Sequence, residues 1–144
     1  MFLGTFEHTV DPKGRMTIPA RFRELILDGA FITLGFENNL IVLKAQTFSS
    51  LSDTINKMSI TNPDARDLRR LMFSHAIEVE IDKAGRILIP SHLRSKIQLE
   101  DQAIVLGAGV YFEIWAPSVW TPRSDELLNG EINNKRFEAL DLSI

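Results

Sequence analysis

Strict alternation of apolar and polar residues marks two short stretches of the chain. In residues 5–10 (TFEHTV) and again in residues 76–81 (AIEVEI), an apolar or aromatic side chain occupies every second position. A period of two is typical of a β-strand with one buried face. We therefore expect a half-buried strand in each place.

Each of these strands leads into turn residues and then a short apolar run. The sequences DPKGR and DKAGR combine an aspartate, which can bond its own backbone, with a glycine, which tolerates positive φ. The apolar runs MTI and ILI follow and predict return strands, so that each unit begins with a tight hairpin. Because proline suits the first turn of a helix, Pro19 and Pro90 predict that a short amphipathic helix comes next.

Further along, the same order of patterns continues in both halves. The sequences FITLGFENNLIVL and AIVLGAGVYFEIW each hold two apolar runs split by polar or small residues, which predicts a second hairpin. Between the halves, apolar residues at helical spacing indicate two helical segments, the second after an Asn-Pro start signal. The charged end of the chain is only weakly periodic and predicts a short C-terminal helix.

A shift of 71 residues lays one half of the chain over the other. The phrases DPKGRMTIPARFR (11–23) and DKAGRILIPSHLR (82–94) share six of thirteen positions, where chance gives about one. We divide the chain into repeat 1 (5–48), a helical spacer (49–75), repeat 2 (76–120) and a C-terminal helical tail (121–144). Units this short bury too little surface to be stable alone, so we expect the two to share one core.

Composition excludes several classes of protein. The 144 residues contain no cysteine, which rules out disulfide frameworks, thiolate zinc sites and cysteine nucleophiles. The longest uncharged run, 102–112, is far shorter than the ~20 residues of a membrane span, so we expect neither secretion nor membrane insertion. The three histidines lack metal-ligand spacing and no Gly-rich phosphate loop appears. We expect no enzyme activity, no metal site and no cofactor.

The charges point instead to nucleic acid. The net charge is -3, yet residues 11–24 and 82–96 each hold four Lys or Arg residues against at most two acidic ones. A basic hairpin tip or two-stranded ribbon is narrow enough to enter a DNA major groove, where arginine reads guanine or clamps phosphate. The principal candidates are Arg15 and Arg86. Nearby phosphate contacts are expected from Lys13, Lys83, Arg21, Arg23, Arg94 and Lys96.

Structural roles compete with these assignments. Asp11 and Asp82 can pair with the arginine four residues on and stabilise the turn, a role that does not exclude DNA binding by the same arginine. A structural ion pair is the stronger expectation for Arg23 and Arg94, which follow their prolines by four residues. A hydrolase that uses the two aspartates as a carboxylate pair is a remote alternative, because turn formation explains them better.

Both phrases resemble the paired motifs of the MraZ family of bacterial transcriptional regulators, a branch of the SpoVT-AbrB superfamily. The resemblance also includes the N-terminal LGTFEHTV, the RRLMFSHA that precedes the second unit and the FEIW strand, and it covers nearly the whole chain. It implies an α+β fold, mainly β, in which tandem AbrB-like swapped-hairpin repeats form a pseudo-dimeric β-core with flanking short helices.

The resemblance also implies a function and partners. It implies a cytoplasmic, nucleoid-associated protein that binds spaced repeats of double-stranded DNA in the promoter of its own division and cell-wall operon, usually as a repressor. Several chains would assemble into a ring, and the family's DNA contacts map onto Asp11 to Arg15 and Asp82 to Arg86. The alternative that the superfamily suggests is an antitoxin or protein-interaction module. Arg21 is replaced by His92 in the second unit, so the two units need not bind alike.

Overall fold

Eight strands and six helices run through residues 1–143, the part of the chain that this computed structural model describes. The first repeat forms β1 (Thr5–Thr9), β2 (Arg15–Thr17), α1 (Ala20–Leu25), β3 (Ala30–Leu34) and β4 (Leu40–Lys44). Helix α2 (Ala45–Asn56) begins in the last residues of repeat 1 and continues into the helical spacer, which also forms α3 (Pro63–Ser74). The second repeat forms β5 (Ile77–Val79), β6 (Arg86–Leu88), α4 (Ser91–Lys96), β7 (Gln102–Gly107) and β8 (Tyr111–Trp115), followed by α5 (Pro117–Leu127) and α6 (Gly130–Glu138).

The two repeats have the same order of elements, which confirms the α+β tandem-repeat prediction. They exchange strands within one antiparallel sheet of order β1-β7-β8-β4-β3-β5. The first strand of repeat 1 pairs with β7 of repeat 2, and the first strand of repeat 2 pairs with β3 of repeat 1. Each repeat therefore completes the sheet of the other, as the swapped-hairpin resemblance implied.

The return strands differ from what their local sequence suggested. A tight hairpin would pair β2 with β1, but those segments share only an isolated bridge between Val10 and Met16. Instead β2 pairs antiparallel with β6 as a separate two-stranded sheet, with Met16 opposite Ile87. We call this pair the β2–β6 ribbon. The local hairpin prediction was wrong because the competing partner lies 71 residues away and buries the same apolar side chains.

One apolar core joins the repeats. Met16 and Ile87 point inward from the β2–β6 ribbon and are almost completely buried, with exposed fractions of 0% and 1%. Phe22 on α1 and Leu93 on α4 occupy equivalent positions on the two short helices and are also buried. All four belong to a single cluster that includes side chains from both repeats. This arrangement confirms that the two units share one core.

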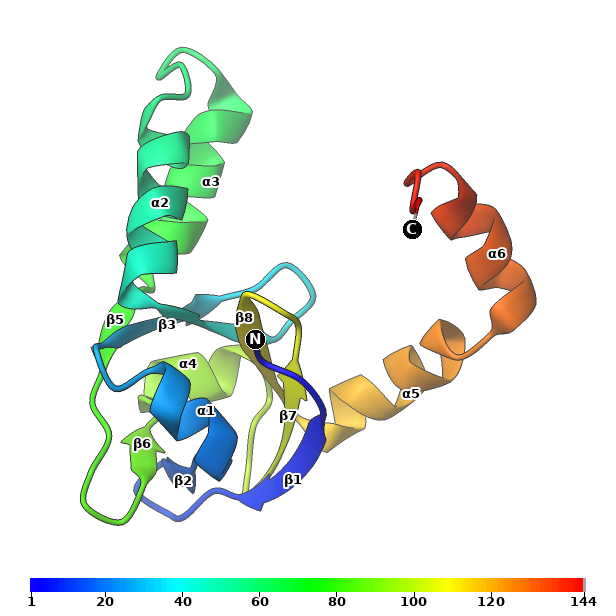
Figure 1. Cartoon of the computed structure of the whole chain (residues 1–144). Helices are drawn as coiled ribbons and strands as arrows, with labels where there is room; N and C mark the ends of the chain where they lie inside the picture. The colour runs from blue at the N-terminus through cyan, green and yellow to red at the C-terminus, as the bar shows by residue number, and fades with distance from the viewer. Residues whose placement is uncertain (144) are drawn as a thin grey trace.

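Two helical projections leave this core (Figure 1). The α2–α3 hairpin rises from the sheet on the side away from the β2–β6 ribbon, packed through Ile55 and Met72 onto β4. Helices α5 and α6 extend on another side as an arm whose residues are not buried. The helical spacing of apolar residues correctly predicted the two helices of the α2–α3 hairpin. Pro19 and Pro90 are the N-caps of α1 and α4 and stand one residue before the helices.

Candidate nucleic-acid interface

The β2–β6 ribbon lies at one end of the molecule and presents one face to solvent (Figure 1). Strand alternation directs Met16 and Ile87 into the core, so the residues on either side of them point outward. The outward residues are Arg15 and Thr17 from β2 and Arg86 and Leu88 from β6. A rigid core thus supports a narrow ribbon that carries the two principal arginines predicted from the sequence.

An aspartate fixes each arginine to its own turn. Asp11 Oδ1 accepts hydrogen bonds from the backbone N–H groups of Lys13 (3.0 Å) and Arg15 (2.8 Å). Its Oδ2 atom accepts one from Arg15 Nε at 2.6 Å. The backbone N–H of Arg15, and then its guanidinium, hold the pKa of the Asp11 carboxyl below its usual range. The carboxylate is therefore ionised at neutral pH and closes the turn.

The second turn repeats this arrangement. Asp82 Oδ1 accepts from the backbone N–H groups of Ala84 and Arg86, both at 2.9 Å, and Oδ2 accepts from Arg86 Nε at 2.9 Å. The pKa of the Asp82 carboxyl is lowered for the same reason, with the Arg86 backbone N–H as the main cause. Arg86 also lies 4.0 Å from Asp11 Oδ2 across the ribbon. Both arginines use Nε for this contact, and their side chains keep exposed fractions of 37% and 33%.

Each turn also contacts the other repeat through its glycine. Gly14 and Gly85 have φ values of +89° and +77°, which L-residues rarely adopt. The Gly85 carbonyl accepts a hydrogen bond from Ile18 N–H at 3.0 Å, and the Gly14 carbonyl accepts one from Ile89 N–H at 2.8 Å. A side chain at either glycine would collide with an arginine of the opposite repeat.

Those opposite arginines are Arg23 and Arg94. Arg94 Nε donates to the Ile89 carbonyl at 2.9 Å, and its guanidinium lies beneath the Gly14 turn. The Arg23 guanidinium lies in the equivalent place beneath Gly85. Both side chains are half-buried, and their contacts support the turns rather than form the carboxylate ion pairs that we expected.

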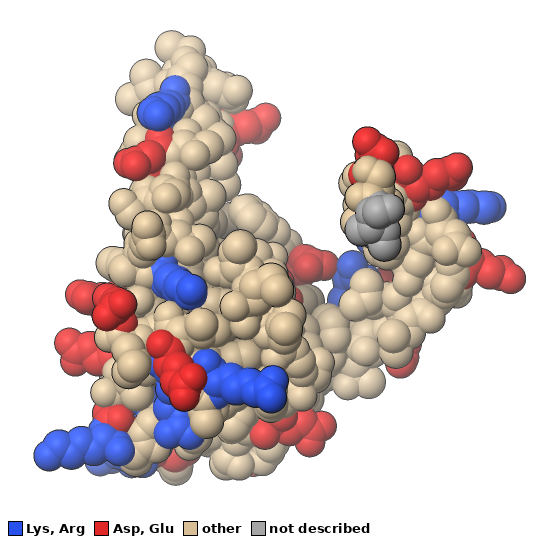
Figure 2. Space-filling view, viewed as in Figure 1, with Lys and Arg blue, Asp and Glu red and all other residues tan. Residues whose placement is uncertain are grey.

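Three of the remaining predicted phosphate contacts belong to the turns and to α1, whereas Lys96 lies beside the β3–β4 loop and Leu71 of α3. Lys13 and Lys83 are exposed at the tips of the two turns, and Arg21 is exposed on α1. Figure 2 shows Lys and Arg side chains gathered with a few acidic ones over the part of the body where Figure 1 places α1, β2 and β6. His92 is exposed on α4 at the position that corresponds to Arg21. The basic face is therefore unequal on its two sides.

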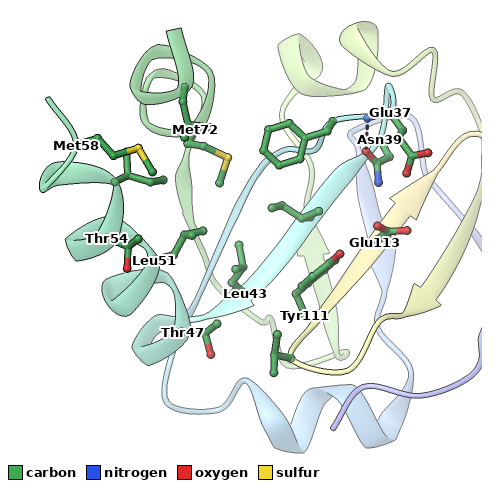
Figure 3. Close-up of a pocket in the computed structure, with 15 residues that line it drawn as sticks. Glu37, Asn39, Leu43, Thr47, Leu51, Thr54, Met58, Met72, Tyr111 and Glu113 are labelled. Carbon is green, nitrogen blue, oxygen red and sulfur yellow. Dashed lines mark hydrogen bonds between the residues drawn. The ribbon is translucent and has the colours of Figure 1, made fainter. Parts of the chain in front are cut away.

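A pocket of about 410 Å³ lies elsewhere, between the α2–α3 hairpin and the sheet (Figure 3). Its wall is mainly apolar and includes Leu51, Met72 and Tyr111, whereas Glu37 and Glu113 lie at one end. Burial, and to a lesser degree the charge of Glu37, raise the pKa of the Glu113 carboxyl. Among residues 1–143, no three His, Asp or Glu side chains are grouped so that they could hold a metal ion.

The fold consists of two interleaved repeats that together build a basic, two-stranded ribbon. These features place the chain in the class of tandem swapped-hairpin proteins, and the ribbon is its candidate DNA-reading face. The chain belongs to the MraZ family: the model described as "MraZ protein", with the addition "antitoxin-like", matches residues 1–71 and again 72–141. Within the described part of the chain, no helix has both the length and the apolar character that a bilayer crossing requires.

Three relatives illustrate how far the similarity extends, and each carries the name "Transcriptional regulator MraZ". The protein of Herpetosiphon aurantiacus is 45% identical over 120 residues, 83% of this chain and 84% of its own. That of Thermomicrobium roseum is 44% identical over 131 residues, or 91% and 92% of the two chains. That of Alkaliphilus metalliredigens is 41% identical over 140 residues, or 96% and 98%. The family is one of regulators and not of enzymes.

Sequence reasoning overlooked two residues of the ribbon. Thr17 and Leu88 share its outward face with the arginines, yet both belong to runs that were interpreted only as apolar return strands. The available signal was the alternation itself, because the middle residue of MTI and of ILI lies two positions after the arginine and therefore on the same face.

Proposed function

We propose that this chain is a sequence-specific DNA-binding transcriptional regulator that reads DNA with the β2–β6 ribbon. One observation carries the proposal: Arg15 and Arg86 lie on the same outward face of a rigid ribbon, each oriented by its own aspartate. The names of its relatives support the same function. A two-stranded ribbon of this kind fits the major groove, which is ~12 Å wide.

The geometry of each arginine suits base recognition. Because Nε donates to the aspartate, the two terminal nitrogens of the guanidinium remain available at its outer edge. Two parallel donors match the O6 and N7 acceptors of guanine, and they also match two oxygens of a phosphate. Asp11 and Asp82 act as positioning residues in this proposal, since their oxygens are already used by the turn.

Phosphate contacts come from the surrounding basic residues. Lys13 and Lys83 extend from the turn tips and Arg21 is exposed on α1, and each is proposed to approach the DNA backbone. Arg23 and Arg94 contribute indirectly by supporting the turns from the opposite repeat.

We further propose that several chains assemble into a ring that binds spaced repeats in the promoter of its own division and cell-wall operon as a repressor. A chain with a net charge of -3 binds DNA weakly through one ribbon, whereas linked ribbons on repeated sites multiply the effective affinity. The arm supports self-association, because it leaves large apolar side chains exposed. These side chains are Leu128, Ile132, Phe137, Leu140 and Leu142. The proposed location is the cytoplasm, on the nucleoid.

A second candidate is an antitoxin-like interaction module, which the description of the family model favours. A small toxin gene beside this gene, and a stable complex of the two products, would support it. Division and cell-wall genes downstream would support the regulator instead.

The test of DNA binding compares two double variants that lose the same charge. R15A/R86A alters the ribbon, whereas R66A/R70A removes two arginines from α3, at the other end of the molecule (Figure 1). Binding to the DNA upstream of the gene is measured at several salt concentrations, with the mass of the free protein as a check on assembly.

Each lost bidentate contact costs about 1–3 kcal/mol, so R15A/R86A should weaken binding by a factor of at least ~25. The α3 control should bind nearly as the wild type does. Equal losses in both variants would refute the ribbon as the DNA-reading face.

A further inference from the structure

The outward face of the ribbon holds four side chains in a fixed rectangle. The register places Arg15 directly opposite Leu88 and Thr17 directly opposite Arg86. Along each strand the two outward residues are ~7 Å apart, from a rise of ~3.4 Å per residue, and the strands are ~5 Å apart. The arginines therefore occupy one diagonal of the rectangle, and Thr17 and Leu88 occupy the other.

This rectangle matches the spacing of base pairs. Two steps of B-DNA advance ~6.8 Å along one strand, close to the separation of the outward residues on β2 or β6. If the arginines meet base edges in the major groove, then the side chains on the other diagonal face neighbouring base edges at the same depth. Thr17 is exposed, and 56% of Leu88 is exposed.

The exposure of Leu88 is unexplained by the fold. The core lies on the opposite face of the ribbon, where Ile87 already fills the position below it. Exposure of a large apolar side chain to water is unfavourable and does not stabilise the fold. The major groove offers one apolar feature at its base edges, the 5-methyl group of thymine.

The two repeats differ at this place alone on the outward face. A two-fold rotation that superposes one repeat on the other puts each arginine in the place of the other, which changes nothing. The same rotation puts Leu88 in the place of Thr17, and these residues differ. Threonine has a hydroxyl that can bond to any base pair and a methyl that can touch thymine, so it discriminates weakly. Leucine has only apolar atoms, so it favours thymine alone.

We propose that Leu88 and Thr17 determine DNA specificity. Leu88 packs on the methyl group of a thymine, whereas Thr17, at the equivalent place in the other repeat, requires no thymine. The inference rests on the proposed DNA binding by the ribbon. It makes the recognised sequence asymmetric: two guanine contacts related by a local two-fold axis, with an obligatory thymine beside only one of them.

The test uses variants that make the two strands equivalent. L88T gives both strands an outward Arg and Thr, and T17L gives both an outward Arg and Leu. The wild type and both variants select their sites from a random double-stranded DNA library. The wild type should select an asymmetric site, L88T should lose the thymine, and T17L should select a thymine on both sides.

A second measurement isolates the methyl group. Deoxyuridine in place of the selected thymine removes only that methyl, and its loss should weaken wild-type binding by about fourfold, from ~0.8 kcal/mol per buried carbon. Binding by L88T should be affected less by the same replacement, because the threonine methyl offers a smaller contact. The salt dependence should be the same for the wild type and L88T, because neither side chain is charged.

The outcomes separate the two proposals. If the wild type selects a site and L88T selects the same one with the same response to deoxyuridine, Leu88 has no such role although the ribbon still reads DNA. If the wild type selects no sequence at all, both the inference and sequence-specific binding fail. Circular dichroism of the variants confirms folding, and T17L provides an independent result.

Discussion

Replacement of Gly85 by alanine tests how the repeats hold each other's turns. Gly85 has a φ of +77°, and the left-handed region costs an L-residue about 1–2 kcal/mol. The new methyl group would also overlap the Arg23 guanidinium, and all of its nearest contacts belong to that one side chain. Such overpacking costs a further ~1–3 kcal/mol. We expect G85A to destabilise the protein by ~2–5 kcal/mol.

Two comparisons separate the contributions. Gly109 has a similar φ of +85° but no atom near the position of a new Cβ, so G109A should cost only the ~1–2 kcal/mol of backbone strain. In the R23A background, G85A should also cost only that amount, because the colliding guanidinium is gone. The expected coupling between the two substitutions is therefore ~1–3 kcal/mol.

The matching turn should behave differently. A Cβ at Gly14 would lie 2.7 Å from Arg94 Nε but also 2.5 Å from the backbone oxygen of Ile89, which cannot move aside. R94A should therefore fail to rescue G14A. The free energies of unfolding come from urea titrations followed by circular dichroism, at one protein concentration because assembly would add to stability. The reasoning is refuted if G85A costs no more than G109A, or if its cost is unchanged in the R23A background.

Two further predictions concern the same face of the molecule. The carboxyls of Asp11 and Asp82 have lowered pKa values when folded, so the stability they provide is present above their unfolded pKa of ~3.9 and is lost as the pH falls through the folded values. The urea midpoint of D11N/D82N should therefore fall less than that of the wild type between pH 5 and the acid limit, and parallel curves would contradict this. K13A/K83A should weaken binding to all DNA sequences and reduce the salt slope by up to ~1 per lysine without a change in the selected site, which a gel-shift titration measures.

Local patterns in the sequence predicted the elements well, because their causes are local. Alternation in TFEHTV and AIEVEI predicted the half-buried strands β1 and β5, and the Asn-Pro signal predicted the start of α3. The shared core followed from the internal repeat and the shortness of each unit. Chain spacing and side-chain periodicity were sufficient for these features.

Strand partners and the roles of distant side chains could not be predicted in this way. Met16 and Ile87 are apolar in either pairing, and only the full fold decides between a local hairpin and the β2–β6 ribbon. Arg23 and Arg94 were interpreted from spacing to their own prolines, whereas their guanidinium groups lie against the glycine turns of the opposite repeat. The outward position of Leu88 was likewise hidden, because ILI was interpreted as an apolar run without regard to which face each residue occupied.

The strand exchange has a consequence for how the protein is made. β1 leaves the ribosome well before its partner β7, which begins about a hundred residues later, at Gln102. Neither repeat can complete its sheet during synthesis of the first half, and long-range antiparallel pairing of this kind is slow. The nascent first half must therefore wait with β1 and β2 unpaired until most of the chain has been translated, and this interval is when the growing polypeptide most needs protection by chaperones.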